Sequence, residues 1–326
     1  TKALYENLPR ALELMEELIL TTDVTDTRRL KEILAENNSR TQEYMQSAGH
    51  AVAAGRALSY GSAKGAAEEM LSGIDQYRLS CGLEKEFEDR KEELVEKLQA
   101  LSRMIFRPEN LMIDFTGDLE ALKKLEEPVA SLKSRLYTCE VERQAYAPVP
   151  CKKNEGFTTP GQVDFVCRAG NFKKKGLPYT GALTVLRVML GYEYLWVNVR
   201  VKGGAYGCMC GFYRDGDGYF CSYRDPNLGQ TVDVFEKAAD FIANYEADER
   251  TMTKYIIGAV SELDIPLTAA GKGRRSREYY FTDITREMLQ AARDQVLDAT
   301  PEDIRALAEY IRAFLSDEFF CVVGNE

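Results

Sequence analysis

The fold is decided by one stretch of the sequence, residues 195–223, which reads LWVNVRVKGGAYGCMCGFYRDGDGYFCSY. The apolar run that leads into it, residues 179–201, fits both the alternation of a strand and a single helical stripe. We predict a helix, because the run is too long for an average strand and Thr180 can cap its start. Lys202 and the pair Gly203-Gly204 then supply the cation and the flexible residues that are typical of a helix end.

After the glycine pair the pattern becomes that of a hairpin. Residues 206–213 form one predicted arm, Asp215-Gly216-Asp217-Gly218 the turn, and residues 219–223 the second arm. Further elements are expected on both sides of this hairpin: strands at 162–167 and 319–323, a helix at about 231–245, and a helix that begins at Thr300-Pro301. The predicted class is α+β, a mainly antiparallel sheet covered by helices on one face.

The N-terminal part has a different pattern. Residues 1–140 are expected to form a helix-rich partial α+β unit with one strand at 111–115, and residues 141–160 a proline-containing linker. Residues 161–326 are expected to form a complete unit. Because both parts end in a helix, an apolar strand and a Gly-Asp or Gly-Asn pair, we predict two similar units, the first truncated at its N-terminus.

Charge and hydropathy restrict the possible partners. The chain has 42 Lys and Arg against 52 Asp and Glu, a net charge of −10, so nucleic acid and anionic membranes are not expected partners. No run of residues is apolar enough for a membrane span and the opening residues do not resemble a signal peptide, so the expected location is cytoplasmic. The basic run 271–277 is interpreted first as a solvated loop, then as lining of a substrate chamber, and last as a phosphate or nucleic-acid site.

The chain contains a single histidine, His50. Zinc motifs built from two histidines need a second imidazole one helical turn away, and Ala51 to Ala54 provide none. A histidine-built zinc site within this chain is therefore excluded, and His50 is interpreted as a structural or surface residue. The close pair Cys208 and Cys210 is interpreted mainly as apolar packing, with a metal or redox role as the alternative.

Two motifs carry a resemblance to a known family. The run 199–207, VRVKGGAYG, and the run 222–227, SYRDPN, resemble the C-terminal half of the presequence-protease branch of the insulinase/pitrilysin metallopeptidases. The order of elements from about residue 160 onwards agrees with this resemblance. Over residues 1–140 it rests on the helix-then-strand order and on Arg107 to Leu111.

The resemblance implies a zinc metalloendopeptidase that degrades unstructured oligopeptides and is built from two similar halves. The N-terminal half of such enzymes holds zinc on an inverted His-x-x-Glu-His helix, so that half and an unfolded peptide are the implied partners. Arg200 and Tyr206 match the Arg and Tyr that reach the substrate carbonyl beside the scissile bond. The other residues of the two motifs are the implied substrate contacts: Gly203, Gly204, Ser222, Tyr223, Arg224 and Asn227.

The same residues have simpler interpretations. Arg200 can be an exposed cation at a helix end, Tyr206 a strand aromatic and the glycine pair an ordinary C-cap. The chain can also be a non-catalytic peptide-binding or assembly module of the same fold, which would keep the shape without the chemistry. A nucleic-acid or phosphate binder that uses residues 271–277 is a third alternative.

Overall fold

The computed structural model describes residues 1–142 and 145–325; the expected linker at 141–160 includes residues 143 and 144, which lie outside this range. Contacts between residues divide the chain into two units. The smaller unit consists of Thr1–Asn37, Ser80–Ala145 and Pro266–Ile284, and the larger unit of Asn38–Leu79, Tyr146–Ile265 and Thr285–Glu326. Both units are discontinuous in sequence, so a single boundary at 141–160 does not describe the contacts.

Helices make up most of both units. In the N-terminal half of the sequence they are η1 (Tyr5–Asn7), α1 (Leu8–Thr21), α2 (Thr27–Ser47), α3 (Gly49–Ser59), α4 (Ala63–Ser72), α5 (Ile74–Lys85), α6 (Phe87–Ile105), η2 (Pro108–Asn110), α7 (Leu119–Lys123) and α8 (Glu126–Arg135). In the C-terminal half they are η3 (Lys173–Lys175), α9 (Ala182–Met189), η4 (Leu190–Lys202), α10 (Leu228–Ala243), α11 (Glu249–Leu263), α12 (Ala269–Phe281), α13 (Arg286–Leu297), α14 (Pro301–Ala306) and α15 (Ala308–Leu315).

The larger unit contains a five-stranded sheet in the order β1-β5-β2-β4-β3. Its strands are β1 (Glu155–Thr158), β2 (Phe165–Asn171), β3 (Gly207–Phe212), β4 (Asp217–Tyr223) and β5 (Phe319–Gly324). The pairing of β1 with β5 is parallel and the other three pairings are antiparallel. The predicted hairpin at 206–223 and the predicted final strand are confirmed, as is the α+β class.

The predicted helix at 179–201 is also confirmed, but its second half is a π-helix, η4. The buried side chains of η4 recur every four to five residues, at Leu190, Tyr194, Leu195 and Val199. Hydrogen bonds in a π-helix join residue i to residue i+5, which gives a wider turn than that of an α-helix and matches this spacing. The wider turn therefore explains why the apolar residues of this run do not follow the spacing of a regular α-helix alone.

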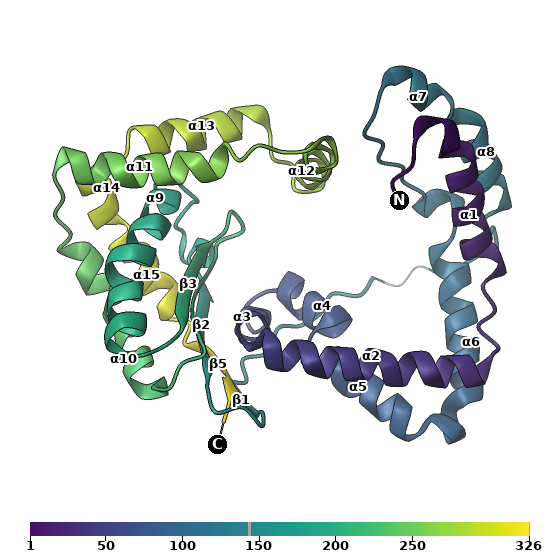
Figure 1. Cartoon of the computed structure of the whole chain (residues 1–326), viewed down its shortest axis with the longest axis horizontal. Helices are drawn as coiled ribbons and strands as arrows, with labels where there is room; N and C mark the ends of the chain where they lie inside the picture. The colour runs from purple at the N-terminus through teal and green to yellow at the C-terminus, as the bar shows by residue number, and fades with distance from the viewer. Residues whose placement is uncertain (143–144, 326) are drawn as a thin grey trace. The chain divides into compact units, whose positions relative to one another are not determined.

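Helices cover one face of the sheet in the way the sequence predicts. The apolar sides of α9, α10, α14, α15 and η4 form the main core together with residues of β2, β3, β4 and β5 (Figure 1). The start of α14 has the expected geometry: Thr300 and Asp303 form a capping box and Pro301 occupies the first turn.

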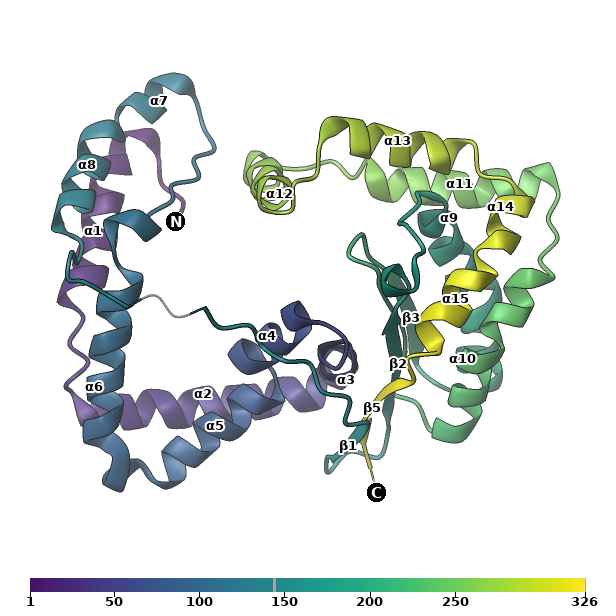
Figure 2. The same cartoon turned by 180° about the vertical axis from the view of Figure 1, so that it is seen from behind.

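The opposite face of the sheet is not open, because α3 lies against it (Figures 1 and 2). Ala53 and Ala57 of α3 contact a row of three cysteines that pair across neighbouring strands: Cys221, Cys167 and Cys321. Small side chains on both sides allow the helix to approach closely, and a Cβ atom at Gly49 would lie 2.3 Å from the Phe165 ring. The sheet therefore carries α3 on its second face in addition to the predicted helical layer.

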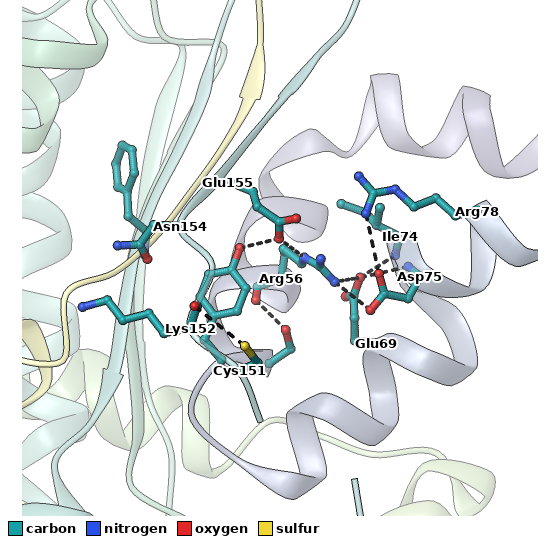
Figure 3. A network of polar contacts seen from close by, with 12 residues as sticks. Arg56, Glu69, Ile74, Asp75, Arg78, Cys151, Lys152, Asn154 and Glu155 are labelled. Atoms are coloured by element: carbon teal, nitrogen blue, oxygen red, sulfur yellow. Dashed lines mark hydrogen bonds and ion pairs between the residues drawn. The ribbon is translucent and has the colours of Figure 1, made fainter. Parts of the chain in front are cut away.

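A buried ionic network fixes α3 to its surroundings (Figure 3). The Arg56 side chain is 1% exposed, and its guanidinium donates to Glu155 of β1 at 2.7 Å and to Glu69 of α4 at 2.8 Å. Asp75 of α5 lies 3.1 Å from the same guanidinium. Tyr60 also donates to Glu155, at 3.0 Å. The network thus links three helices to the edge strand of the sheet.

The smaller unit contains no strand within the described residues, so the strand predicted at 111–115 is wrong. That segment is extended but lacks a partner strand, and it lies beside α12. Arg277 pairs with Asp114 at 3.4 Å, and a Cβ atom at Gly273 would meet the Thr116 hydroxyl. The apolar run 111–115 therefore does not belong to a sheet within the described residues.

The basic run 271–277 is likewise not a loop. It lies within α12, whose N-cap Thr268 accepts a hydrogen bond from the backbone N–H of Gly271. Within residues 1–142 and 145–325, none of the helices combines the length and the apolar content that a membrane crossing needs.

Candidate functional site

The first motif lies where η4 ends and β3 begins. The backbone N–H of Gly204 donates to Arg200 O at 2.9 Å, and that of Ala205 donates to Val199 O at 3.1 Å. Gly204 has a φ of 80°, which favours glycine, and a Cβ atom at Gly203 would lie 2.5 Å from Val199 O. The glycine pair is thus required by the tight turn between helix and strand.

The second motif completes the framework of this turn. The backbone N–H of Tyr206 donates to Tyr223 O at 3.0 Å and to Arg224 O at 3.1 Å. The Asn227 side-chain amide donates to Gly203 O at 2.7 Å. The two motifs, which are separate in sequence, are therefore held together by backbone and amide hydrogen bonds.

Two buried side chains, those of Asp225 and Ser222, stabilise the backbone around the second motif. Asp225 is fully buried, and its carboxylate accepts from the Thr231 hydroxyl at 2.6 Å and from the Asn227 backbone N–H at 2.9 Å. Ser222 is also fully buried, and its hydroxyl accepts from the Val166 backbone N–H at 3.1 Å. The geometry gives Ser222 and Asn227 framework contacts, whereas they were expected to contact substrate.

The turn brings the side chains of Arg200 and Tyr206 together. The Arg200 guanidinium carbon lies 5.4 Å from the centroid of the Tyr206 ring and 4.0 Å from that of Trp196. Tyr206 is 65% exposed, and Arg200 is partly exposed. Within the part of the chain that the structure describes, no carboxylate pairs with Arg200. The site therefore presents an unpaired cation and a phenol hydroxyl side by side.

Tyr223 and Arg224 extend the site away from Arg200. The Tyr206 and Tyr223 rings are 5.9 Å apart, and the exposed Arg224 lies over Tyr223 at 5.6 Å. Tyr223 also packs against His50 in a T-shaped arrangement, with the ring centroids 4.9 Å apart. Burial lowers the pKa of His50, which favours a neutral imidazole that packs against the aromatic rings. His50 is thus a packing residue under the site, as interpreted from the sequence.

The sequence reasoning missed Trp196. It is the single tryptophan of the chain and is 41% exposed, with its indole against Arg200. The signal that could have identified it is its position four residues before Arg200, which places both residues on the same side of one helix.

A metal is not held by the residues present here. The described residues contain no group of three or more His, Cys, Asp or Glu side chains arranged to bind a metal ion. Cys210 and Cys208 do not provide thiolates at neutral pH, because burial raises the pKa of each thiol to about 12. Their interpretation as packing residues agrees with this environment.

Comparisons with known proteins identify the family to which the chain belongs. Residues 154–324 match the family described as PreP C-terminal domain, and residues 1–83 match a family described as associated with subfamily C of the M16 peptidases. The chain is 38% identical over 325 residues to Protein HypA of Clostridium perfringens, a match that covers 100% of this chain and 33% of that protein. It is 28% identical over 303 residues to Presequence protease 1, chloroplastic/mitochondrial, of Arabidopsis thaliana, covering 91% of this chain and 28% of that protein.

The fold is also similar to that of a solved structure. The crystal structure of pitrilysin superposes with a TM-score of 0.59 at 12% identity, covering 98% of this chain and 33% of that chain. The chain thus spans about a third of the length of the curated relatives it matches. These matches show that the chain belongs to the presequence-protease type of the M16 peptidase family, and that it is part of the C-terminal half of such a peptidase.

Proposed function

We propose that this chain is the substrate-binding half of a zinc metalloendopeptidase that degrades unstructured oligopeptides. Members of the M16 family are zinc metallopeptidases, and the family match covers the part of the chain that contains Arg200 and Tyr206. In this proposal the zinc is held by a separate N-terminal half, which is the partner of this chain, and an unfolded peptide is the substrate.

The observation that carries the proposal is the geometry of Arg200 and Tyr206. A guanidinium without an acidic partner among the described residues and an exposed phenol lie next to each other, on a turn that two glycines and several backbone hydrogen bonds define. An exposed cation at an ordinary helix end does not require two glycines and a set of backbone hydrogen bonds to fix its position. A rigid pair of hydrogen-bond donors is what recognition of an anionic oxygen requires.

The chemical role follows from the charge that develops during peptide hydrolysis. When a nucleophile attacks the scissile carbonyl, negative charge accumulates on the carbonyl oxygen. The Arg200 guanidinium and the Tyr206 hydroxyl would donate hydrogen bonds to this oxygen and stabilise the charge more strongly than they stabilise the neutral carbonyl. Neither group gains or loses a proton in this role.

The nucleophile itself must come from outside these residues. The chain has one histidine, which packs against Tyr223, and the described residues contain no metal-binding cluster. The residues present do not fit a zinc ion, so this chain is assigned binding and charge stabilisation only.

The proposal is tested by metal analysis and a peptide-cleavage assay on the purified chain. The chain alone is expected to contain less than stoichiometric zinc and to leave a fluorogenic oligopeptide intact, and cleavage is expected when a zinc-bearing N-terminal half is added. Chelator-sensitive cleavage by the chain alone would contradict the division of roles. Peptide binding without any rate enhancement in the assembled protein would instead support a non-catalytic binding module.

A further inference from the structure

The Arg200 guanidinium lies against two aromatic side chains. Within residues 1–142 and 145–325 its side chain forms neither a salt bridge nor a hydrogen bond. Its close neighbours are two aromatic faces, Trp196 at 4.0 Å and Tyr206 at 5.4 Å from the respective ring centroids. A cation is attracted to the face of an aromatic ring, and indole is the best of the aromatic partners. Trp196 is therefore the strongest constraint on the direction in which this cation points.

The π-helix explains how Trp196 comes to lie under Arg200. In a helix whose turn contains four to five residues, side chains four residues apart lie above one another. The buried residues of η4, among them Leu190, Leu195 and Val199, hold the helix against the main core. Trp196 is consequently free to contact Arg200 while 41% of its surface is exposed.

We propose that Trp196 is a positioning residue for Arg200, an inference that rests on the proposed function. The indole face holds the guanidinium against one surface and limits its rotation. Its N–H donors are thereby kept beside the Tyr206 ring before substrate arrives, which lowers the reorganisation needed to bind a developing oxyanion. Trp196 lies outside the main core, and it acts on the reacting atoms only through Arg200.

A kinetic comparison in the full-length peptidase that contains this chain tests the role. Trp196→Leu is expected to lower kcat about tenfold with little change in KM, the effect of losing a partly exposed cation–π contact. Trp196→Phe keeps an aromatic face and is expected to recover most of the rate. The matched control is Tyr192→Leu, an aromatic residue on the same helix that is 71% exposed and that lies outside the contacts of Arg200. This control is expected to stay within about twofold of the parent rate.

Fluorescence gives a readout that does not depend on activity. Because Trp196 is the one tryptophan among the 326 residues, its emission reports on its own surroundings. Arg200→Leu in the 326-residue chain is expected to change the intensity and wavelength of this emission. Arg214→Leu removes an equal charge from a cation that lies 4.7 Å over the Tyr179 ring, and it should leave the emission unchanged.

The possible outcomes separate this inference from the proposed function. If Trp196→Leu keeps the parent kcat while Arg200→Ala lowers it, the positioning role is overturned and the function of Arg200 stands. If Arg200→Ala keeps the parent kcat, the proposed function fails and the positioning role fails with it. Equal losses for Trp196→Leu and Trp196→Phe, or an emission that Arg200→Leu does not change, would also overturn the inference. A rate that falls with Leu and recovers with Phe supports it.

Discussion

Replacing Arg56 by Met is expected to destabilise the larger unit strongly. The Arg56 side chain is 1% exposed and lies within 3.1 Å of three carboxylates, those of Glu69, Asp75 and Glu155. Burial by itself lowers the pKa of Arg56, but the hydrogen bonds and charges of these acids more than offset that effect and raise it. The cation is therefore present at every accessible pH, and its loss leaves buried negative charges without a counterion.

The magnitude follows from how much of each carboxylate stays solvated. Removing one partner of a buried ion pair typically destabilises a protein by about 3–5 kcal/mol. Glu69 is only 6% exposed, but it keeps hydrogen bonds from the backbone N–H groups of Ile74 and Asp75 at 2.7 and 3.2 Å. Glu155 is 22% exposed and keeps the bond from Tyr60. These remaining contacts place the expected loss for Arg56→Met near the lower limit, about 3 kcal/mol.

The assay is urea unfolding followed by far-UV circular dichroism, with Arg78→Met as the matched control. Arg78 pairs with the same Asp75, but at 3.8 Å and with 56% of its side chain exposed, so its loss should change the unfolding free energy by less than about 1 kcal/mol. A loss below about 1 kcal/mol for Arg56→Met, equal to that of the control, would refute the view that this network holds α3 against the sheet.

Three further predictions concern acid stability, thiol accessibility and the glycine turn. Burial raises the pKa of Glu155, but the hydrogen bonds from Arg56 and Tyr60 outweigh this effect and hold the pKa below its ordinary 4.5. The stability that Glu155 contributes is therefore present above pH 4.5 and is lost as the pH falls through the folded-state pKa. Glu155→Gln should flatten this acid loss in unfolding measurements between about pH 6 and pH 3, and an unchanged profile would contradict the prediction. Thiol labelling of the native protein, followed by peptide mapping, should be fast at the exposed Cys139 and Cys151 and slow at the buried cysteines. Rapid labelling of the buried row Cys167, Cys221 and Cys321 would mean that α3 does not cover the sheet. Gly203→Ala should lower the unfolding free energy by about 1–3 kcal/mol, because the new methyl group would lie 2.5 Å from Val199 O, and a loss below about 0.5 kcal/mol would show that the turn can relax.

The arrangement of Arg200 and Tyr206 could be predicted from the sequence, because it depends on residues that follow one another directly in the chain. A helix end, two glycines and a strand start follow one another directly in the run 199–207, so the proximity of Arg200 and Tyr206 follows from the turn alone. The capped helix at Thr300 and the hairpin at 206–223 are confirmed for the same reason.

The wrong predictions all depend on contacts between distant segments. Residues 111–115 are a short apolar run that resembles a strand, but no strand of the smaller unit pairs with them within the described residues. Residues 271–277 carry two glycines and four cations, yet their packing beside residues 114–116 and the cap at Thr268 favour a helix. The position of α3 on the sheet could not be predicted either, because Ala53 and Ala57 contact strands that come much later in the sequence.

The central claim is tested most directly by the rate of peptide cleavage in the full-length peptidase that carries Tyr206→Phe or Arg200→Ala. Each change removes a donor to the developing oxyanion and little buried volume, so each should lower kcat about 10²–10³-fold while the unfolding free energy stays near that of the parent. The control Tyr213→Phe, on the same hairpin but outside the motif, should keep the parent rate. A parent-like kcat in both Tyr206→Phe and Arg200→Ala would contradict the account, and Arg200 and Tyr206 would then be an ordinary helix-end cation and strand aromatic.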